Sequence, residues 1–188
     1  MKTRLEFILI LLMVLTLSGL SGFIFGVKSS EYDNIQKTQK FIENMKKNDP
    51  NLYKYWTKII HYSSKYGISP YWVASVICSE TGFNPNSISP VGAVGLAQIM
   101  PDTAKGIAKE IGIKKYSLKN ADIQVMFCCH YLKNCLKRFG GNITLATASY
   151  NCGPGNAKIY HTIPQTKTYV RRVMSKYKHY KKEYCSIN

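Results

Sequence analysis

The chain has 188 residues, of which 45% are hydrophobic and 12% aromatic, and a formal net charge of +16 at pH 7. This apolar content supports a folded core and argues against an intrinsically disordered chain. Lys and Arg outnumber Asp and Glu by 26 to 10, which suggests an anionic partner such as nucleic acid or a cell envelope. Because no zinc-finger spacing or aromatic RNA-binding signature accompanies the charge, no nucleic-acid partner is predicted.

An uncharged apolar run covers residues 7–27 and follows Lys2 and Arg4. As a helix it would be about 31 Å long, which matches a hydrocarbon core of about 30 Å. Basic residues before the run and acidic residues soon after it favour a cytoplasmic amino terminus. Residues 1–28 are therefore predicted to be a signal anchor that holds the rest at the extracytoplasmic face of the cytoplasmic membrane. A cleaved signal peptide and a secreted product are the alternative.

The rest of the chain shows apolar residues at helical spacing and no alternating strand pattern of useful length, which predicts an all-α fold. Ser69 and Pro70 predict a helix start, and Gly82 its end. Residues 29–58 are interpreted as a helical lead-in and residues 59–188 as one domain. Turn signals divide the predicted helices, of which 118–139 is expected to be the longest: 35–47, 52–66, 71–80, 101–111, 118–139, 142–150 and 169–184.

Six cysteines allow two main interpretations. An even count in an exported chain is compatible with disulfides, and buried free thiols are the favoured alternative. A metal site is not expected, because the chain has no C-x-x-C and its four histidines are scattered. The cysteines are Cys78, Cys128, Cys129, Cys135, Cys152 and Cys185.

Glu80 lies at the end of the helix predicted over 71–80. The apolar residues Val73, Val76 and Ile77 precede it by seven, four and three positions, so its carboxylate is expected on the buried face. Burial would raise its pKa towards neutrality, which suits an acid that donates a proton near pH 7. The alternative is a Glu at a fraying helix end that points into water.

Three segments carry longer motifs: E-T-G-F-N-P-N-S-I-S-P-V-G-A-V-G-L-A-Q-I-M-P-D-T-A at 80–104, S-Y-N-C-G-P-G at 149–155 and I-P-Q-T-K-T-Y-V at 163–170. In order and spacing they resemble the signatures of the lytic transglycosylases of the soluble, lysozyme-like type. The resemblance implies an all-helical lysozyme-like fold in which Glu80 faces a groove for peptidoglycan glycan strands, with no cofactor and no metal.

The resemblance also assigns positions in that groove. Each has a structural alternative, because such side chains also hold loops, serve turns or pack in cores. The positions expected to contact sugar or support the catalytic carboxylate are Thr81, Ser89, Gln98, Met100, Tyr150, Asn151 and Tyr169.

The chain departs from the family's usual pattern at four positions. Thr81 replaces the usual Ser and keeps a hydroxyl, and Cys152 replaces the commoner Ala. Ala97 stands where the family usually has Met, which is expected to widen or reshape a subsite. Gln165 stands where the third signature usually has Glu, which removes an acid.

The implied activity is cleavage between N-acetylmuramic acid and N-acetylglucosamine. In the family's chemistry Glu80 protonates the glycosidic oxygen and then deprotonates the muramic 6-hydroxyl, which gives a 1,6-anhydro product. A hydrolytic muramidase of the goose lysozyme type and a silent peptidoglycan-binding scaffold of a secretion apparatus are the alternatives.

The carboxy-terminal segment is strongly basic and is expected to contact anionic envelope polymer or lipid, or else to form a solvated face. Only Glu183 opposes its charge. The basic residues are Lys167, Arg171, Arg172, Lys176, Lys178, Lys181 and Lys182.

Overall fold

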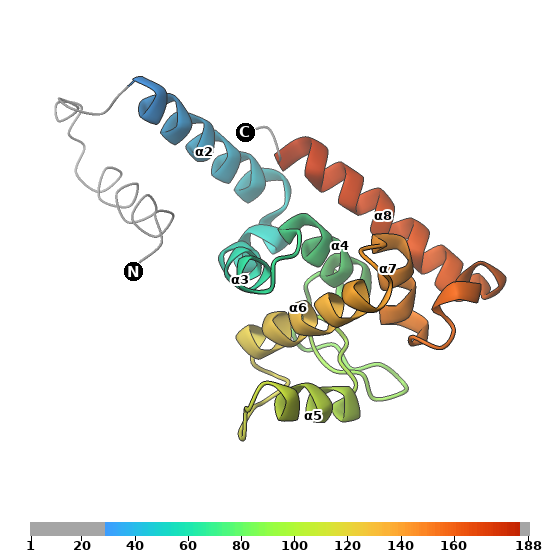
Figure 1. Ribbon diagram of the computed structural model, residues 1–188. Helices are drawn as coiled ribbons and strands as arrows, with labels where there is room; N and C mark the ends of the chain where they lie inside the picture. Colours follow the sequence, from blue (N-terminus) through green and yellow to red (C-terminus); the bar gives the residue numbers. More distant parts are fainter. Residues whose placement is uncertain (1–28, 185–188) are drawn as a thin grey trace.

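The computed structural model describes residues 29–184, and over this range the all-α prediction is confirmed (Figure 1). Strand pairing there is limited to isolated bridges in the loop between residues 82 and 100. The elements are α2 (Ser29–Asn48), α3 (Pro50–Tyr66), α4 (Pro70–Thr81), α5 (Pro101–Glu110), α6 (Ala121–Arg138), α7 (Ile143–Cys152), η1 (Ala157–Thr162) and α8 (Pro164–Tyr184).

The predicted signal anchor at 1–28 lies outside the described residues. Within 29–184, no helix is both long and apolar enough to cross a membrane. The expected boundary between lead-in and domain, at residue 58, falls inside α3, which continues through it without a break.

Helix α4 lies at the centre of the fold and packs against α3, α6 and α8 (Figure 1). It begins at Pro70, as predicted, and ends where Gly82 adopts the left-handed conformation, with φ of 62°. The Ser69 side chain, expected to cap the helix, makes no capping hydrogen bond. Trp72 is completely buried and its Nε1 donates to Oγ1 of Thr147 in α7 at 2.9 Å. A helix buried on nearly all sides fixes the direction in which its last turn points.

Helix α8, not the helix around 118–139, is the longest described helix, with 21 residues against 18 in α6. The side chain of Asn120 accepts hydrogen bonds from the backbone N–H groups of Asp122 and Ile123, so α6 starts after it. Helix α8 begins at Pro164, five residues before the predicted start, because proline is tolerated in a first turn. Its buried stripe comprises Thr166, Tyr169, Val170, Val173, Tyr180 and Tyr184.

Aromatic side chains join the two ends of the described chain. The ring of Phe41 in α2 contacts Trp56 in α3 and Tyr184 in α8, at centroid distances of 5.8 and 5.5 Å. The hydroxyl of Tyr71 donates to the carbonyl of Tyr184 at 2.7 Å, and the hydroxyl of Tyr184 donates to Asp49. These contacts hold α8 against α3 and α4.

The five described cysteines are free thiols, and Cys128, Cys129 and Cys135 are buried. Burial raises the pKa of the Cys128 thiol to about 12. This thiol therefore remains protonated at neutral pH and does not act as a thiolate. The free-thiol interpretation therefore describes residues 29–184, and Cys185 lies outside them.

A buried amide in α6 holds the loop that follows α4. Gln124 is 1% exposed; its Oε1 accepts from the N–H of Ala97 at 3.1 Å, and its Nε2 donates to the carbonyls of Val94 and Leu118 at 2.9 and 2.8 Å. Gly95 passes so close that a Cβ there would lie 2.6 Å from this Nε2. The loop thus depends on a glycine and on a glutamine far away in the sequence.

We expect Gly95→Ala to destabilise the fold more than Gly92→Ala. Both glycines have positive φ, 75° and 86°, but a Cβ on Gly92 would meet no atom within 4 Å. The backbone strain from positive φ is therefore common to both variants. The difference between their free energies of unfolding, about 1 to 3 kcal/mol, measures the crowding against Gln124. Urea unfolding of the two variants tests this; equal midpoints would show that the loop gives way without cost.

Candidate active site

Glu80 occupies the last turn of α4 and is partly exposed. The residues at the preceding helical positions, Val73, Val76 and Ile77, are completely buried, so the expected buried face is confirmed. Loss of water around the carboxyl raises the pKa of Glu80 to about 7. At neutral pH this group can therefore both donate and accept a proton.

Two side chains of α8 oppose that upward shift without reversing it. The hydroxyl of Tyr169, itself 3% exposed, donates to Oε1 of Glu80 at 2.7 Å. One turn later the positive charge of Arg172 also favours the carboxylate and lowers the pKa of Glu80. Burial has the larger effect. Because burial and the neighbouring Glu80 raise the pKa of Tyr169 well above its usual range, this phenol stays neutral and remains a donor.

Arg172 is held in place by two further contacts. Its Nη2 donates to the carbonyl of Ser79 at 3.0 Å, and its guanidinium lies over the Tyr169 ring, 5.6 Å from the centroid. Among the described residues, the contact with the ring and the single hydrogen bond to a carbonyl leave most of the guanidinium N–H groups without a partner.

The loop across the site is fixed through its backbone. The hydroxyl of Thr81 donates to the carbonyl of Leu96 at 2.8 Å, and the hydroxyl of Tyr150 in α7 donates to that of Ala97 at 2.7 Å. Ala97 is completely buried, so its side chain presents no surface to a ligand. The loop is thus held by side chains from both the last turn of α4 and the end of α7.

Gln98 and Ser89 shape the same loop. Gln98 has a positive φ of 49°, and its Nε2 donates to the carbonyls of Ser87 and Gly95 at 3.2 and 3.0 Å. The hydroxyl of Ser89 accepts from the N–H of Ala93 at 2.9 Å. Both side chains make the loop-holding contacts that were their structural alternatives. Met100, at the start of α5, is 40% exposed and free to contact a ligand.

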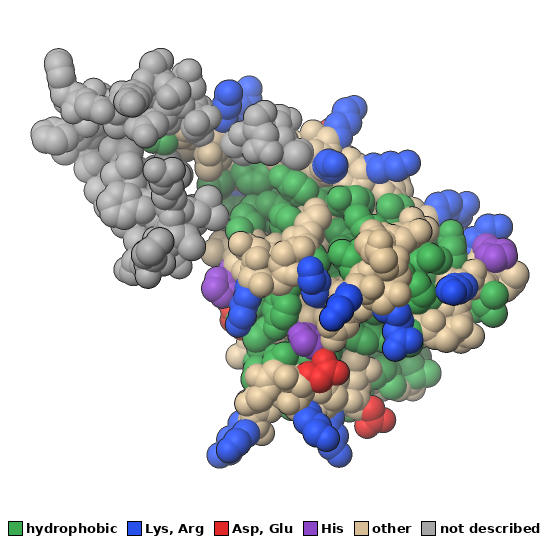
Figure 2. All heavy atoms as spheres, viewed as in Figure 1, with side chains coloured by type: hydrophobic (Ala, Val, Ile, Leu, Met, Phe, Trp, Pro, Cys, Tyr) green, Lys and Arg blue, Asp and Glu red, His purple; other side chains and the backbone are tan. Residues whose placement is uncertain are grey.

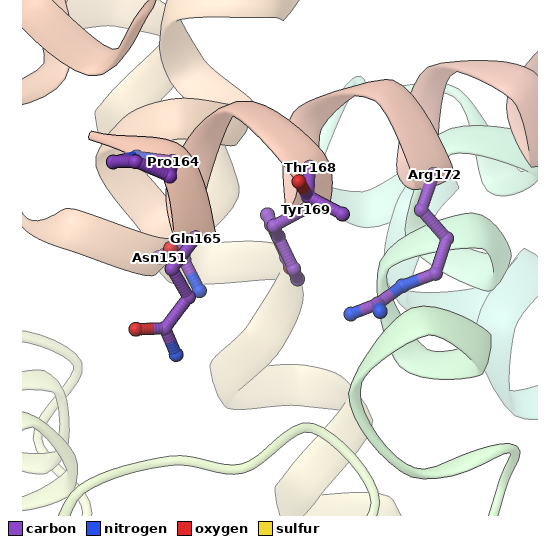
Figure 3. Close-up of a pocket in the computed structure, with 6 residues that line it drawn as sticks. All are labelled: Asn151, Pro164, Gln165, Thr168, Tyr169 and Arg172. Carbon is purple, nitrogen blue, oxygen red and sulfur yellow. The ribbon is translucent and has the colours of Figure 1, made fainter. Parts of the chain in front are cut away.

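A hollow of about 430 Å³ opens beside this group, between the end of α7 and the start of α8. Figure 3 shows Asn151, Tyr169 and Arg172 extending from the two helices toward the same space. Tyr169 connects the hollow directly to Glu80. The lining residues are Asn151, Pro164, Gln165, Thr168, Tyr169 and Arg172.

A second hollow of about 350 Å³ lies between α5, α6 and the end of α7. Ser149 lines it and Asn151 lines the first hollow, two residues apart on α7. Each hollow therefore borders the end of α7.

Comparison with known proteins agrees with this arrangement. The model of the transglycosylase SLT domain matches residues 57–172, more than half of the chain. The chain belongs to this family. It is 34% identical over 103 residues to the soluble lytic murein transglycosylase of Escherichia coli K12. It is 43% identical over 54 residues to a transglycosylase of Enterobacteria phage PRD1.

These matches cover 53% and 29% of the chain, and only 16% and 20% of the two relatives. The SLT-domain chain thus corresponds to a small part of the length of these proteins.

Solved structures of the family share the fold. One is an inactive glutamate-to-glutamine mutant of lytic transglycosylase Slt from Pseudomonas aeruginosa, with a TM-score of 0.64 and 29% identity over 68% of this chain and 24% of that one. Another is the 70 kDa soluble lytic transglycosylase of E. coli, with a TM-score of 0.64 and 26% identity over 83% of this chain and 31% of that one. The lysozyme-like all-α fold implied by the motifs is therefore confirmed.

The structure separates the expected site residues into two groups. Tyr169 and Asn151 line the first hollow, and Glu80 is hydrogen-bonded to Tyr169. Side chains that hold the loop are Thr81, Ser89, Gln98 and Tyr150. Exposed Met100 belongs to neither group. Sequence reasoning placed Arg172 only in the basic segment and missed Gln124. The three-residue spacing between Tyr169 and Arg172 could have indicated a shared helix face, whereas nothing local indicates that Gln124 is buried.

We expect Tyr169→Phe to raise the pKa of Glu80 further. The variant removes a donor that favours the charged carboxylate, while burial, which favours the protonated form, remains. Carbon-detected NMR titration of the Glu80 carboxyl should give a pKa of about 7 in the original protein and a higher value in the variant. Tyr53→Phe, at an exposed position in α3, is the control, and an unchanged or lower pKa in Tyr169→Phe would contradict the assignment.

Proposed function

We propose that this protein is a peptidoglycan lytic transglycosylase in which Glu80 serves as acid and then as base. The observation that carries the proposal is a single partly buried carboxyl with a pKa of about 7, bonded to Tyr169 and placed beside an open hollow. Membership of a family whose named members are murein transglycosylases supports the same reaction.

In the proposed reaction, protonated Glu80 gives its proton to the glycosidic oxygen between N-acetylmuramic acid and N-acetylglucosamine, and the bond from the anomeric carbon to that oxygen breaks. The resulting carboxylate is stabilised by the Tyr169 hydroxyl. It then takes the proton of the muramic 6-hydroxyl as that oxygen bonds to the anomeric carbon. The proton returns to Glu80 and the product is a 1,6-anhydro sugar, so no water is consumed.

The composition of the hollow supports one carboxylate rather than two. Hydrolytic glycosidases usually place two carboxyl groups across the scissile bond. Within the described part of the chain, the six residues that line the hollow include no acid. Asp102 lies in the first turn of α5, where the helix dipole favours it. A reaction that takes its nucleophile from the sugar fits this site better.

We assign the other site residues by their contacts. Exposed Asn151 and Met100 are placed to touch sugar. Tyr169 positions and tunes Glu80 through its hydroxyl. The remaining four support the loop that borders the glycan: Thr81, Ser89, Gln98 and Tyr150.

We expect Glu80→Gln to abolish cleavage of purified sacculi while the protein remains folded. The amide keeps the shape but neither donates nor accepts the required proton, and each proton-transfer role typically contributes about 100- to 10,000-fold. Mass spectrometry of products from the original protein should show 1,6-anhydro-N-acetylmuramic acid ends.

Glu43→Gln, which removes a carboxylate from α2, is the matched control. Products with only reducing muramic ends would show a hydrolytic muramidase instead. Full activity of Glu80→Gln would show that the site is elsewhere, and glycan binding without turnover in the original protein would show a silent scaffold.

We further propose that the enzyme works at the outer face of the cytoplasmic membrane, held by the apolar segment 7–27 and assisted by α8. The far end of α8 exposes Lys178, Lys181 and Lys182 while its stripe of buried residues faces the domain. Basic side chains outnumber acidic ones on the face seen in Figure 2. Such a surface attracts anionic polymer or lipid headgroups, and salt screens the attraction.

Fractionation and salt washing should separate these two attachments. The full chain is expected to stay in the membrane fraction at high salt because a spanning segment is held by its apolar surface. A form lacking residues 1–28 is expected to bind isolated envelopes at low salt and to leave them at high salt. A soluble mature form starting close after Gly22 would reject the anchor, and salt-independent binding of the shortened form would reject the electrostatic role of α8.

A further inference from the structure

Among the residues that the structure describes, Arg172 is the only charged one that lines the hollow beside Glu80. Salt bridges between residues 35 and 184 join Lys58 to Asp122 and His130 to Glu110, and neither involves Arg172. Its guanidinium donates a hydrogen bond to the neutral carbonyl of Ser79. Among residues 35–184, no carboxylate oxygen lies within 4 Å of the Arg172 nitrogens, and the arginine charge acts on Glu80 only at longer range.

The other polar side chains around Arg172 are neutral. Asn151 and Gln165 contribute amides, and Thr168 contributes a hydroxyl; all three are exposed and can donate hydrogen bonds to an anion. Gln165 stands at the position where the third signature usually has Glu. An acid there would introduce a negative charge into the hollow, and the glutamine leaves the charge of Arg172 available.

We propose that Arg172, with Asn151, Gln165 and Thr168, forms a subsite for a free carboxylate of the peptide stem carried by the glycan next to the scissile bond. A guanidinium presents parallel N–H groups that match the two oxygens of a carboxylate. The contact with the Tyr169 ring and the hydrogen bond to Ser79 hold the guanidinium before a ligand arrives. Little conformational freedom is therefore lost on binding.

This subsite rests on the proposed function, because the muramic acid of peptidoglycan carries stem peptides with free carboxyl groups. It adds a preference: strands with charged stems should bind better than strands with amidated stems. Uncharged sugar contacts elsewhere in the site would not distinguish these substrates.

Equilibrium binding in a Glu80→Gln background tests the subsite without turnover. Two soluble glycan oligomers of equal length are compared by calorimetry: one with free stem carboxyls and one with those carboxyls converted to amides. The background protein should bind the free-carboxyl form about tenfold more tightly than the amidated form.

Arg172→Gln should abolish that tenfold preference, and Gln165→Glu should abolish it as well while the arginine remains. Lys65→Gln, which removes one positive charge from the exposed end of α3, should retain it. Gln165→Glu changes an exposed side chain, so it tests the subsite even where Arg172→Gln perturbs the fold.

A preference that survives both substitutions, or one that Lys65→Gln abolishes equally, would overturn the subsite. So would equal binding of the free-carboxyl and amidated forms by the background protein. The proposed function fails separately, when the unmodified protein releases no 1,6-anhydro ends from sacculi. Release of such ends together with an arginine-independent preference would leave the function in place and reject only the subsite.

Discussion

The carboxyl of Glu80 lies in the last turn of a helix whose core-facing residues are completely buried, and the partial loss of water around this group raises its pKa. Desolvation alone would keep the group protonated, which suits the acid of the proposed reaction but not the base that would follow it. Tyr169 and Arg172 favour the opposite form. Because both come from α8, the contact between α4 and α8 determines the balance between the two roles.

That balance requires a rigid border around the carboxylate. The loop after α4 has almost no strand pairing, yet its backbone is bonded from three directions by the side chains of Thr81, Gln124 and Tyr150. Because these bonds go to backbone atoms, they fix the course of the loop without relying on its side chains, apart from Gly95, where a Cβ would meet Gln124. A buried polar side chain such as Gln124 is stable only because its amide atoms find partners in that backbone.

Local rules predicted the helices well where a start or stop residue was present. Pro70 and Gly82 bound α4 as expected because proline fits a first turn and glycine the left-handed end. The same rules failed at α8, where Pro164 was not interpreted as a helix start. The η1 turn before it has no sequence pattern of its own. The position of Glu80 followed from helical spacing, whereas its partner Tyr169 is 89 residues away and was found only through the resemblance. Gln124 and the role of Arg172 depend on tertiary contacts that no local pattern contains.

Arg172 acts on the pKa of Glu80 and is also the centre of the proposed carboxylate subsite. Its charge lowers the pKa of Glu80, which would leave more of the acid ionised than the first step of the proposed reaction needs. On the proposed subsite, a stem carboxylate bound to the same guanidinium would cancel part of that charge. Glu80 would then hold its proton more strongly while substrate is bound, and NMR titration of its carboxyl with and without a stem peptide measures the difference. The residue that selects the substrate would thereby also prepare the acid for its first proton transfer.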